Sequence, residues 1–196
     1  MAALGVGRTA AYRRVAACVE RGLLERLDLL RDEPRLLRAT RAGLRYAGLG
    51  LGVAKVSPGS VDHWLRCAST ALVLTQEFGS GCVLSERELR LVERIEGRPI
   101  ASAKLGAGPH GAPRLHRPDL VVSTDAGLLA VEVELTPKAP RRLEALIRAW
   151  RRASWVSEIR YYCTPGVTRR ALERAVEKTH AGDRVHLLEV VSRCGA

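Results

Sequence analysis

The sequence predicts an α/β protein in which a mixed β-sheet has helices on both faces. An acidic hairpin is expected first, with one strand on either side of a turn at Asp125–Gly127. Amphipathic helical segments and short apolar strands then alternate toward the end of the chain. A hairpin pairs its strands antiparallel and a helical crossover pairs them parallel, so both kinds of pairing are expected in one sheet. The expected segments are strands at 119–122 and 128–136, a helix at 140–154, a strand at 159–163, a helix at 168–178 and a strand at 185–191.

The first 48 residues are expected to form a small domain of their own. Its first helix has Thr9 as the expected N-cap, because a hydroxyl can accept a hydrogen bond from a free backbone N–H. The helix is expected to end at Arg21–Gly22, since glycine readily takes the left-handed conformation found at helix ends. Strands at 23–30 and 35–39 and a short helix at 40–46 follow. Residues 49–58 are the predicted linker, which leaves residues 59–196 for the second domain.

The region between the linker and the acidic hairpin is harder to interpret. Ser60 is expected to cap a helix that continues to about Thr75, because apolar residues recur there at helical spacing. Residues 85–90 fit a strand or a helix equally well. Residues 101–116 contain three glycines and two prolines and are predicted to form a flexible loop. We expect His110 and His116, which lie in this loop, to be close to where a substrate would enter.

The charge of the chain favours a polyanionic partner. Its 196 residues carry 32 basic and 21 acidic side chains, with a net charge of +11 and a pI near 10.2. Arginine supplies nearly all of the positive charge, and its planar guanidinium binds phosphate in a bidentate manner. Codon bias in a GC-rich genome would explain arginine in place of lysine, but not the excess of bases over acids. We therefore expect contact with double-stranded DNA.

Other sequence features bear on the compartment. No apolar run reaches the roughly 18 residues that a membrane-spanning helix needs, and the N-terminal residues do not resemble a signal peptide. The five cysteines are odd in number and widely scattered, without the close spacing of a zinc site. We therefore expect reduced cysteines in a cytoplasmic protein that does not bind membranes.

Three acids dominate the acidic hairpin. Asp119 stands at the head of the first strand, and Glu132 and Glu134 are two residues apart on the second. Side chains alternate along a strand, so these glutamates are expected on one face, and the hairpin should bring Asp119 near them. Converging carboxylates favour a divalent cation, and oxygen ligands suit Mg²⁺ or Mn²⁺. The alternative is that the two glutamates form the solvent face of an edge strand.

The same residues resemble the PD-(D/E)xK phosphodiesterases, whose fold is that of many restriction endonucleases. The segment VEVELTPKAPRR at residues 131–142, after Pro118-Asp119 and behind a small N-terminal domain, more closely resembles the replication-relaxation family of plasmids and mobile elements. The resemblance implies a restriction-endonuclease-like core. It implies that Asp119 and Glu132 bind the metal, with Glu134 as a third ligand or a general base. The superfamily places a lysine where this chain has Glu134, so Lys138 would be the catalytic lysine in a shifted position and Arg142 the next candidate cation. Glu86 or Glu88 is the expected further ligand.

The first 48 residues resemble bacterial winged-helix DNA-binding domains. The resemblance rests on the order of a helix, the segment RGLLER, a basic hairpin and the segment TRAGLRYAG. One departure is that only Met1–Gly7 precede the first helix, where the family has two more helices. Either translation starts upstream, or the domain is trimmed and a partner, such as a second copy in a homodimer, covers its core. The expected DNA-binding residues are Arg8, Thr9, Tyr12, Arg13 and Arg14 on the helix, Arg35 on the hairpin, and Arg141 and Arg142 in the second domain.

Three functions are compatible with these observations. The first is metal-dependent cleavage or nicking of DNA during replication or relaxation of a plasmid or mobile element. The second is a regulator of replication or transcription that binds DNA without catalysis and keeps a degenerate nuclease fold. The third is a protein-interaction module built on the same fold. Asp119, Glu132, Glu134 and Lys138 distinguish the first function from the other two, because only catalysis needs all four.

Overall fold

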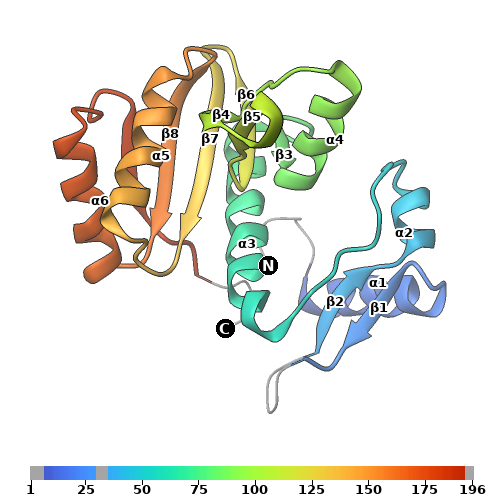
Figure 1. The fold of residues 1–196 in the computed structure, drawn as a ribbon. Coiled ribbons are helices and arrows are strands. Elements are labelled where there is room, and N and C mark those ends of the chain that lie inside the picture. The colour runs from blue at the N-terminus through green and yellow to red at the C-terminus, as the bar shows by residue number, and fades with distance from the viewer. Residues whose placement is uncertain (1–6, 30–34, 193–196) are drawn as a thin grey trace. The chain divides into compact units, whose positions relative to one another are not determined.

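The computed structural model describes residues 7–29 and 35–192 (Figure 1). The turn expected between the first two strands falls largely outside these residues. The chain divides into two compact units, with the boundary between Leu65 and Arg66. Each unit is described by itself below.

The first unit has the expected order of helix, two strands and helix. Strands β1 and β2 pair antiparallel, with Leu24 opposite Ala39 and Leu27 opposite Leu36. No α1 side chain is fully buried; the half-buried ones include Val15 and Val19. The elements are α1 (Arg8–Glu20), β1 (Leu24–Leu27), β2 (Leu36–Ala39), α2 (Arg41–Tyr46) and the short 3₁₀ helix η2 (Pro58–Ser60).

The prediction of how the first helix is capped is wrong at its N-terminus and correct at its C-terminus. The residue before α1 is Gly7, which has extended backbone and no side chain to cap with, while Thr9 lies inside the first turn. At the other end Gly22 takes a φ of 67°, as a glycine after a helix often does. Helix α2 does have a threonine cap, because the Thr40 hydroxyl accepts a hydrogen bond from the Gly43 N–H at 3.0 Å.

Gly43 fixes how α2 packs within this unit. A Cβ atom at this position would lie 2.0 Å from the carbonyl oxygen of Leu23. The Thr40 hydroxyl donates to the carbonyl of the neighbouring Gly22 at 2.6 Å, so α2 is tied to the same stretch of backbone by two residues. Only glycine permits this close approach.

The second unit contains a five-stranded mixed sheet in the order β3-β6-β7-β8-β9. β3, β6 and β7 pair antiparallel, whereas β7, β8 and β9 are parallel. The expected hairpin closes tightly, with Thr124 opposite Gly127. The strands are β3 (Val83–Ser85), β6 (Leu120–Thr124), β7 (Gly127–Glu134), β8 (Val156–Cys163) and β9 (Val185–Glu189).

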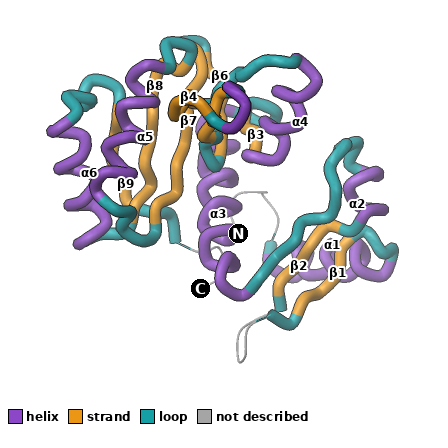
Figure 2. The backbone as a smooth tube through the Cα atoms, in the orientation of Figure 1, coloured by secondary structure: helices purple, strands orange, loops and turns teal. Residues whose placement is uncertain are grey.

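Helices cover both faces of this sheet (Figure 2). On one face Ala130 of β7 packs in a core with residues of α5 and α6, including Ile147 and Leu172. On the other face Val131 and Val133 pack with Leu74 of α3. The predicted α/β class with helices on both faces is therefore confirmed. The helices are α3 (Val61–Phe78), α4 (Glu86–Glu96), α5 (Pro140–Arg152) and α6 (Val167–Lys178).

The sequence predicted a flexible loop at residues 101–116, and this prediction is wrong. They contain a second, separate hairpin of β4 (Ala103–Ala107) and β5 (Pro113–His116), joined through the short 3₁₀ helix η3 (Pro109–Gly111). Its glycines, alanines and prolines have low strand propensity, and the pairing shifts register between Lys104 and Ala107. Residues 85–90, which the sequence left undecided, end β3 at Ser85 and begin α4.

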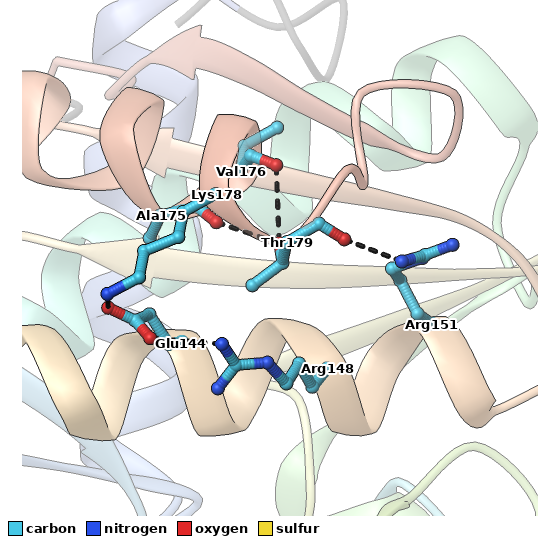
Figure 3. Close-up of polar contacts among 7 residues, drawn as sticks. All are labelled: Glu144, Arg148, Arg151, Ala175, Val176, Lys178 and Thr179. Atoms are coloured by element: carbon cyan, nitrogen blue, oxygen red, sulfur yellow. Dashed lines mark hydrogen bonds and ion pairs between the residues drawn. The ribbon is translucent and has the colours of Figure 1, made fainter.

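A polar cluster holds α5 against α6 (Figure 3). The Glu144 carboxylate on α5 accepts hydrogen bonds from Lys178 at 2.7 Å and from Arg148 at 3.1 Å. Arg151, one turn farther along α5, donates to the backbone carbonyl of Thr179 at 2.6 Å, just past the end of α6. The hydrogen bond from Lys178 is the main reason that the pKa of Glu144 lies below its usual value.

We expect Gly43→Ala to lower the free energy of unfolding by about 1–3 kcal/mol, because the added methyl group forces α2 away from Leu23. Urea unfolding of the full chain, followed by circular dichroism, measures the loss. Gly59→Ala is the matched control, since a Cβ atom there meets nothing within 4 Å. An equal loss in both variants would contradict the close-packing account.

We expect the stability difference between the wild type and Glu144→Gln to depend on pH. A lowered pKa in the folded state means that ionised Glu144 stabilises the fold above its unfolded pKa, and that this contribution disappears as the pH falls through the folded value. Thermal unfolding at about pH 7 and about pH 4 should show the difference shrinking. Glu173→Gln, which removes an exposed partner of Arg169, should show a smaller effect. A difference that does not change with pH would contradict this assignment.

Candidate functional site

The two glutamates of the acidic hairpin lie on the central strand of the sheet. β7 is flanked by β6 and β8, and both Glu132 and Glu134 have only 5% of their surface exposed. They alternate with Val131 and Val133, so they share the face on which Ala130 packs toward α5 and α6. The expectation of a single face is confirmed. The alternative of a solvent-facing edge strand is wrong, because strands pair with β7 on both sides.

Asp119 lies at the same end of the hairpin. It directly precedes β6, and the pairing of Leu120 with Val131 brings it level with Glu132. Its Oδ2 atom accepts a hydrogen bond from the backbone N–H of Val133 at 2.8 Å. The carboxylate is therefore fixed to the backbone of β7 between the two glutamates.

Glu132 has a histidine partner. The Nε2 atom of His116, at the end of β5, lies 2.6 Å from Oε1 of Glu132. The His116 ring also meets Trp150 of α5 edge to face, with ring centroids 5.7 Å apart. Burial lowers the pKa of His116, but the charge and hydrogen bond of Glu132 outweigh burial, so the pKa is raised overall. The contact with Glu132 therefore favours the protonated form of the His116 imidazole.

Glu134 has a lysine partner. Lys138 follows the end of β7 and returns so that its ammonium pairs with the Glu134 carboxylate. Burial is the main reason that the pKa of Lys138 is lowered, and the charge of Arg142 adds to this effect. The charges of Glu132 and Asp119 act in the opposite direction, so Lys138 lies within electrostatic range of both of these acids. Lys138, which the sequence suggested as the lysine in a shifted position, thus lies beside Glu134.

Two buried polar atoms border this cluster. Tyr161 of β8 lies opposite Glu132 in the parallel pairing, and its hydroxyl is fully buried. Within the described residues, neither this hydroxyl nor the Nε1 atom of Trp150 makes a hydrogen bond of good geometry, although Trp150 lies close enough to Tyr161 to lower its pKa against the larger effect of burial. Burial, together with the charge of Glu132, raises the pKa of Tyr161 well above its usual value. The phenol therefore stays neutral and can still donate one hydrogen bond.

Glu86 and Glu88, one of which was expected to be a further metal ligand, instead contact residues at the start of their own helix, α4. Glu88 accepts hydrogen bonds from the backbone N–H and hydroxyl of Ser85, which caps α4, and Glu86 pairs with Arg90. A thiol that the sequence did not single out is close to the acids instead. Burial and the charges of Asp119, Glu132 and Glu86 raise the pKa of Cys67 on α3.

The expected DNA-binding side chains lie at the surface of their own units. The α1 residues expected to bind DNA are all exposed, and the guanidinium of Arg8 lies over the ring of Tyr12 at 5.7 Å. Arg35 is exposed and pairs with Asp28 at 2.8 Å. The predicted outward face of α5 is confirmed, since its arginines are exposed, whereas Leu143, Leu146, Ile147 and Trp150 are buried. The exposed residues from these sets are Arg8, Thr9, Tyr12, Arg13, Arg14, Arg35, Arg141 and Arg142.

The side chains of this cluster are of the chemical type that binds a hard divalent cation. Asp119 and Glu132 supply oxygen donors at one end of the sheet, which is the ligand type that Mg²⁺ and Mn²⁺ prefer. A carboxylate has two oxygens, so Glu132 can keep His116 on Oε1 and offer the other oxygen to a cation. Glu134, which pairs with Lys138, contributes less readily.

Comparison with protein-family models, with curated proteins and with solved structures finds no match to this chain. Within the described ranges, no helix is both long enough and apolar enough to cross a bilayer. Function therefore has to be inferred from the residues of the two units themselves.

We expect His116→Ala to lower the free energy of unfolding by about 1–3 kcal/mol, because it leaves buried Glu132 without its donor. His116→Gln should lose less, since its amide can still donate. Urea unfolding followed by tryptophan fluorescence measures both changes. His186→Ala, which alters an exposed histidine on β9, is the control. Equal losses at His116 and His186 would contradict a structural link between His116 and Glu132.

Proposed function

We propose that this chain is a DNA-binding protein whose second unit carries a metal-dependent phosphodiesterase site of the PD-(D/E)xK type. The observation that carries the proposal is the pairing of Lys138 with Glu134, beside Glu132 and Asp119 on one end of a sheet. Two acids that can bind a metal and one lysine are the parts that this chemistry needs. We propose a role in the replication or relaxation of a plasmid or mobile element, which the resemblance of residues 117–163 implies.

The strand order supports the proposal. β3, β6 and β7 pair antiparallel, α5 is a crossover and β8 is parallel to β7, so the strand that carries Glu132 has an antiparallel neighbour on one side and a parallel one on the other. Asp119, directly before β6, and Glu132 on β7 are the residues to which the resemblance assigns the metal.

Each residue of the cluster has a proposed task. Asp119 and Glu132 hold Mg²⁺ or Mn²⁺, which when bound lowers the pKa of a water and offsets charge on the phosphate. Lys138 supplies a positive charge near the phosphate, and Glu134 orients its ammonium. His116 holds Glu132 in one position through the contact at 2.6 Å. The backbone N–H of Val133 does the same for Asp119.

The first unit supplies DNA affinity in this proposal. Arg8, Arg13 and Arg14 are exposed on α1, which carries no acid before Glu20 near its end. Their guanidinium groups suit phosphate oxygens, and Arg35 of β1–β2 can add a backbone contact. Binding to duplex DNA is expected to weaken steeply as the salt concentration rises.

A second candidate function has its own supporting observation. Glu132 and Glu134 each have a basic partner from the chain, His116 and Lys138, and these can offset the buried charge without a metal. This arrangement favours a regulator of replication or transcription that keeps the fold and binds DNA without cutting it. The two candidates differ in whether the acids bind a divalent cation.

A nicking assay tests the proposal. We expect the wild-type chain to convert supercoiled plasmid to open circles with Mg²⁺. Asp119→Asn and Glu132→Gln should reduce the rate by at least about 100-fold, because loss of a partner that merely orients a metal ligand already costs about 10- to 100-fold. Lys138→Met should reduce the rate without abolishing Mn²⁺ binding, which electron paramagnetic resonance measures apart from turnover. Glu173→Gln is the control for loss of an exposed acid.

The two candidates give different outcomes. Nicking that persists unchanged in Asp119→Asn would come from a contaminant and would contradict the proposed phosphodiesterase activity. Salt-dependent duplex binding without Mn²⁺ binding or nicking favours the regulator. Absence of duplex binding would contradict both candidate functions.

A further inference from the structure

The β4–β5 hairpin is basic and contains no acid. Residues 97–118 include no aspartate or glutamate. Lys104 and Arg114 are both exposed on the hairpin. Its basic side chains and histidines, with those that flank it, are Arg98, Lys104, His110, Arg114, His116 and Arg117. Such a segment attracts polyanions and has no acid of its own to weaken that attraction.

The hairpin forms a narrow ribbon outside the main sheet. β4 and β5 pair only with each other, and the residues around the turn are exposed. The side chains near the turn are small, as at Gly106, Ala107, Gly111 and Ala112. A two-stranded ribbon of this kind is narrow enough to lie along a groove of duplex DNA. These small side chains are too short to read base edges, so the contacts that the ribbon offers are to phosphates.

The base of the ribbon is held firmly by one buried acid. Glu93 of α4, with 5% of its surface exposed, accepts hydrogen bonds from the backbone N–H of Ile100 at 2.9 Å and from the hydroxyl of Ser102 at 2.6 Å. Its other oxygen accepts from Nε of Arg117 at 2.9 Å. Because Ser102 and Arg117 flank the hairpin on either side, its two strands leave the core at fixed positions.

The ribbon also packs against α5 and the turn that follows it. Ala103 and Leu105 contact the core on that side. Arg152 donates to the carbonyl of Lys104 at 3.4 Å, and the Lys104 ammonium lies over the exposed ring of Trp155 at 5.8 Å. The Lys104 ammonium and the Trp155 ring thus form one exposed surface beside the ribbon.

The ribbon ends at the acidic cluster. His116 is the last residue of β5, and its imidazole bonds to Glu132 at 2.6 Å. Arg114 lies two residues earlier, so alternation places it on the same face of the ribbon as His116, whereas Lys104, which pairs with Leu115, lies on the other face. The end of β5 is therefore anchored beside Glu132 through His116.

We infer that the β4–β5 hairpin is a second DNA-binding element, which contacts the sugar-phosphate backbone of a duplex through Lys104 on one face of the ribbon and Arg114 on the other. This inference rests on the proposed function, because it takes duplex DNA as the partner. The contact is independent of base sequence. It adds to the contacts made by the first unit and does not replace them.

Salt-dependent binding of the full chain to a fluorescent duplex, measured by anisotropy, tests the inference. Each lost phosphate contact lowers the slope of log K against log salt by about 0.9, so Lys104→Ala/Arg114→Ala should lower it by about 1.8. The loss should be the same for duplexes of unrelated sequence. Lys104→Arg/Arg114→Lys keeps both charges and should keep the slope. The matched control is Arg170→Ala/Arg174→Ala, which removes two exposed charges from α6, on the other side of α5 (Figure 1).

The outcomes separate this inference from the proposed function. A wild-type chain that binds duplex with salt dependence, and a hairpin variant with an unchanged slope, would overturn the ribbon alone. A control variant that loses as much slope as the hairpin variant would also overturn it, because the effect would then reflect total charge. A wild-type chain without salt-dependent binding would overturn the proposed function, and the ribbon with it.

Discussion

Glu132 and Glu134 lie on the central strand of the sheet, almost wholly removed from water, and His116 and Lys138 hold their ionised side chains there. Burying a carboxylate costs several kcal/mol unless charge and hydrogen bonds compensate for it. Much else in the second unit follows from this requirement. β5 must end where its histidine reaches Glu132, and the chain after β7 must turn back so that its lysine reaches Glu134.

The balance of charge in this cluster bears on its chemistry. Together with Asp119, the three carboxylates carry one more negative charge than His116 and Lys138 can offset when both are protonated. That excess lies at the end of the sheet that the basic hairpin and α5 border. Such an excess would repel a polyanion, so the proposed DNA binding would require a cation at the acidic cluster.

Much of the second unit could be predicted from sequence because its signals are local. Alternation along β7 placed both glutamates on one face, and the spacing of Leu143, Ile147 and Trp150 identified the buried face of α5. Lys138 could be anticipated because it lies four residues beyond Glu134. His116 could not be assigned to Glu132, since the two are sixteen residues apart and meet only through tertiary packing. The hairpin that carries His116 was missed because glycine, alanine and proline signal loops more strongly than strands.

The division of the hairpin into a fixed base and an exposed turn has an evolutionary consequence. Glu93 closes the base, and His116 joins the end of β5 to Glu132, whereas residues 106–112 pack on little else. Insertions, deletions or new side chains around the turn can therefore change what the ribbon touches while leaving the acidic cluster in place. Selection could in this way change the surface of the ribbon independently of the acidic cluster next to it.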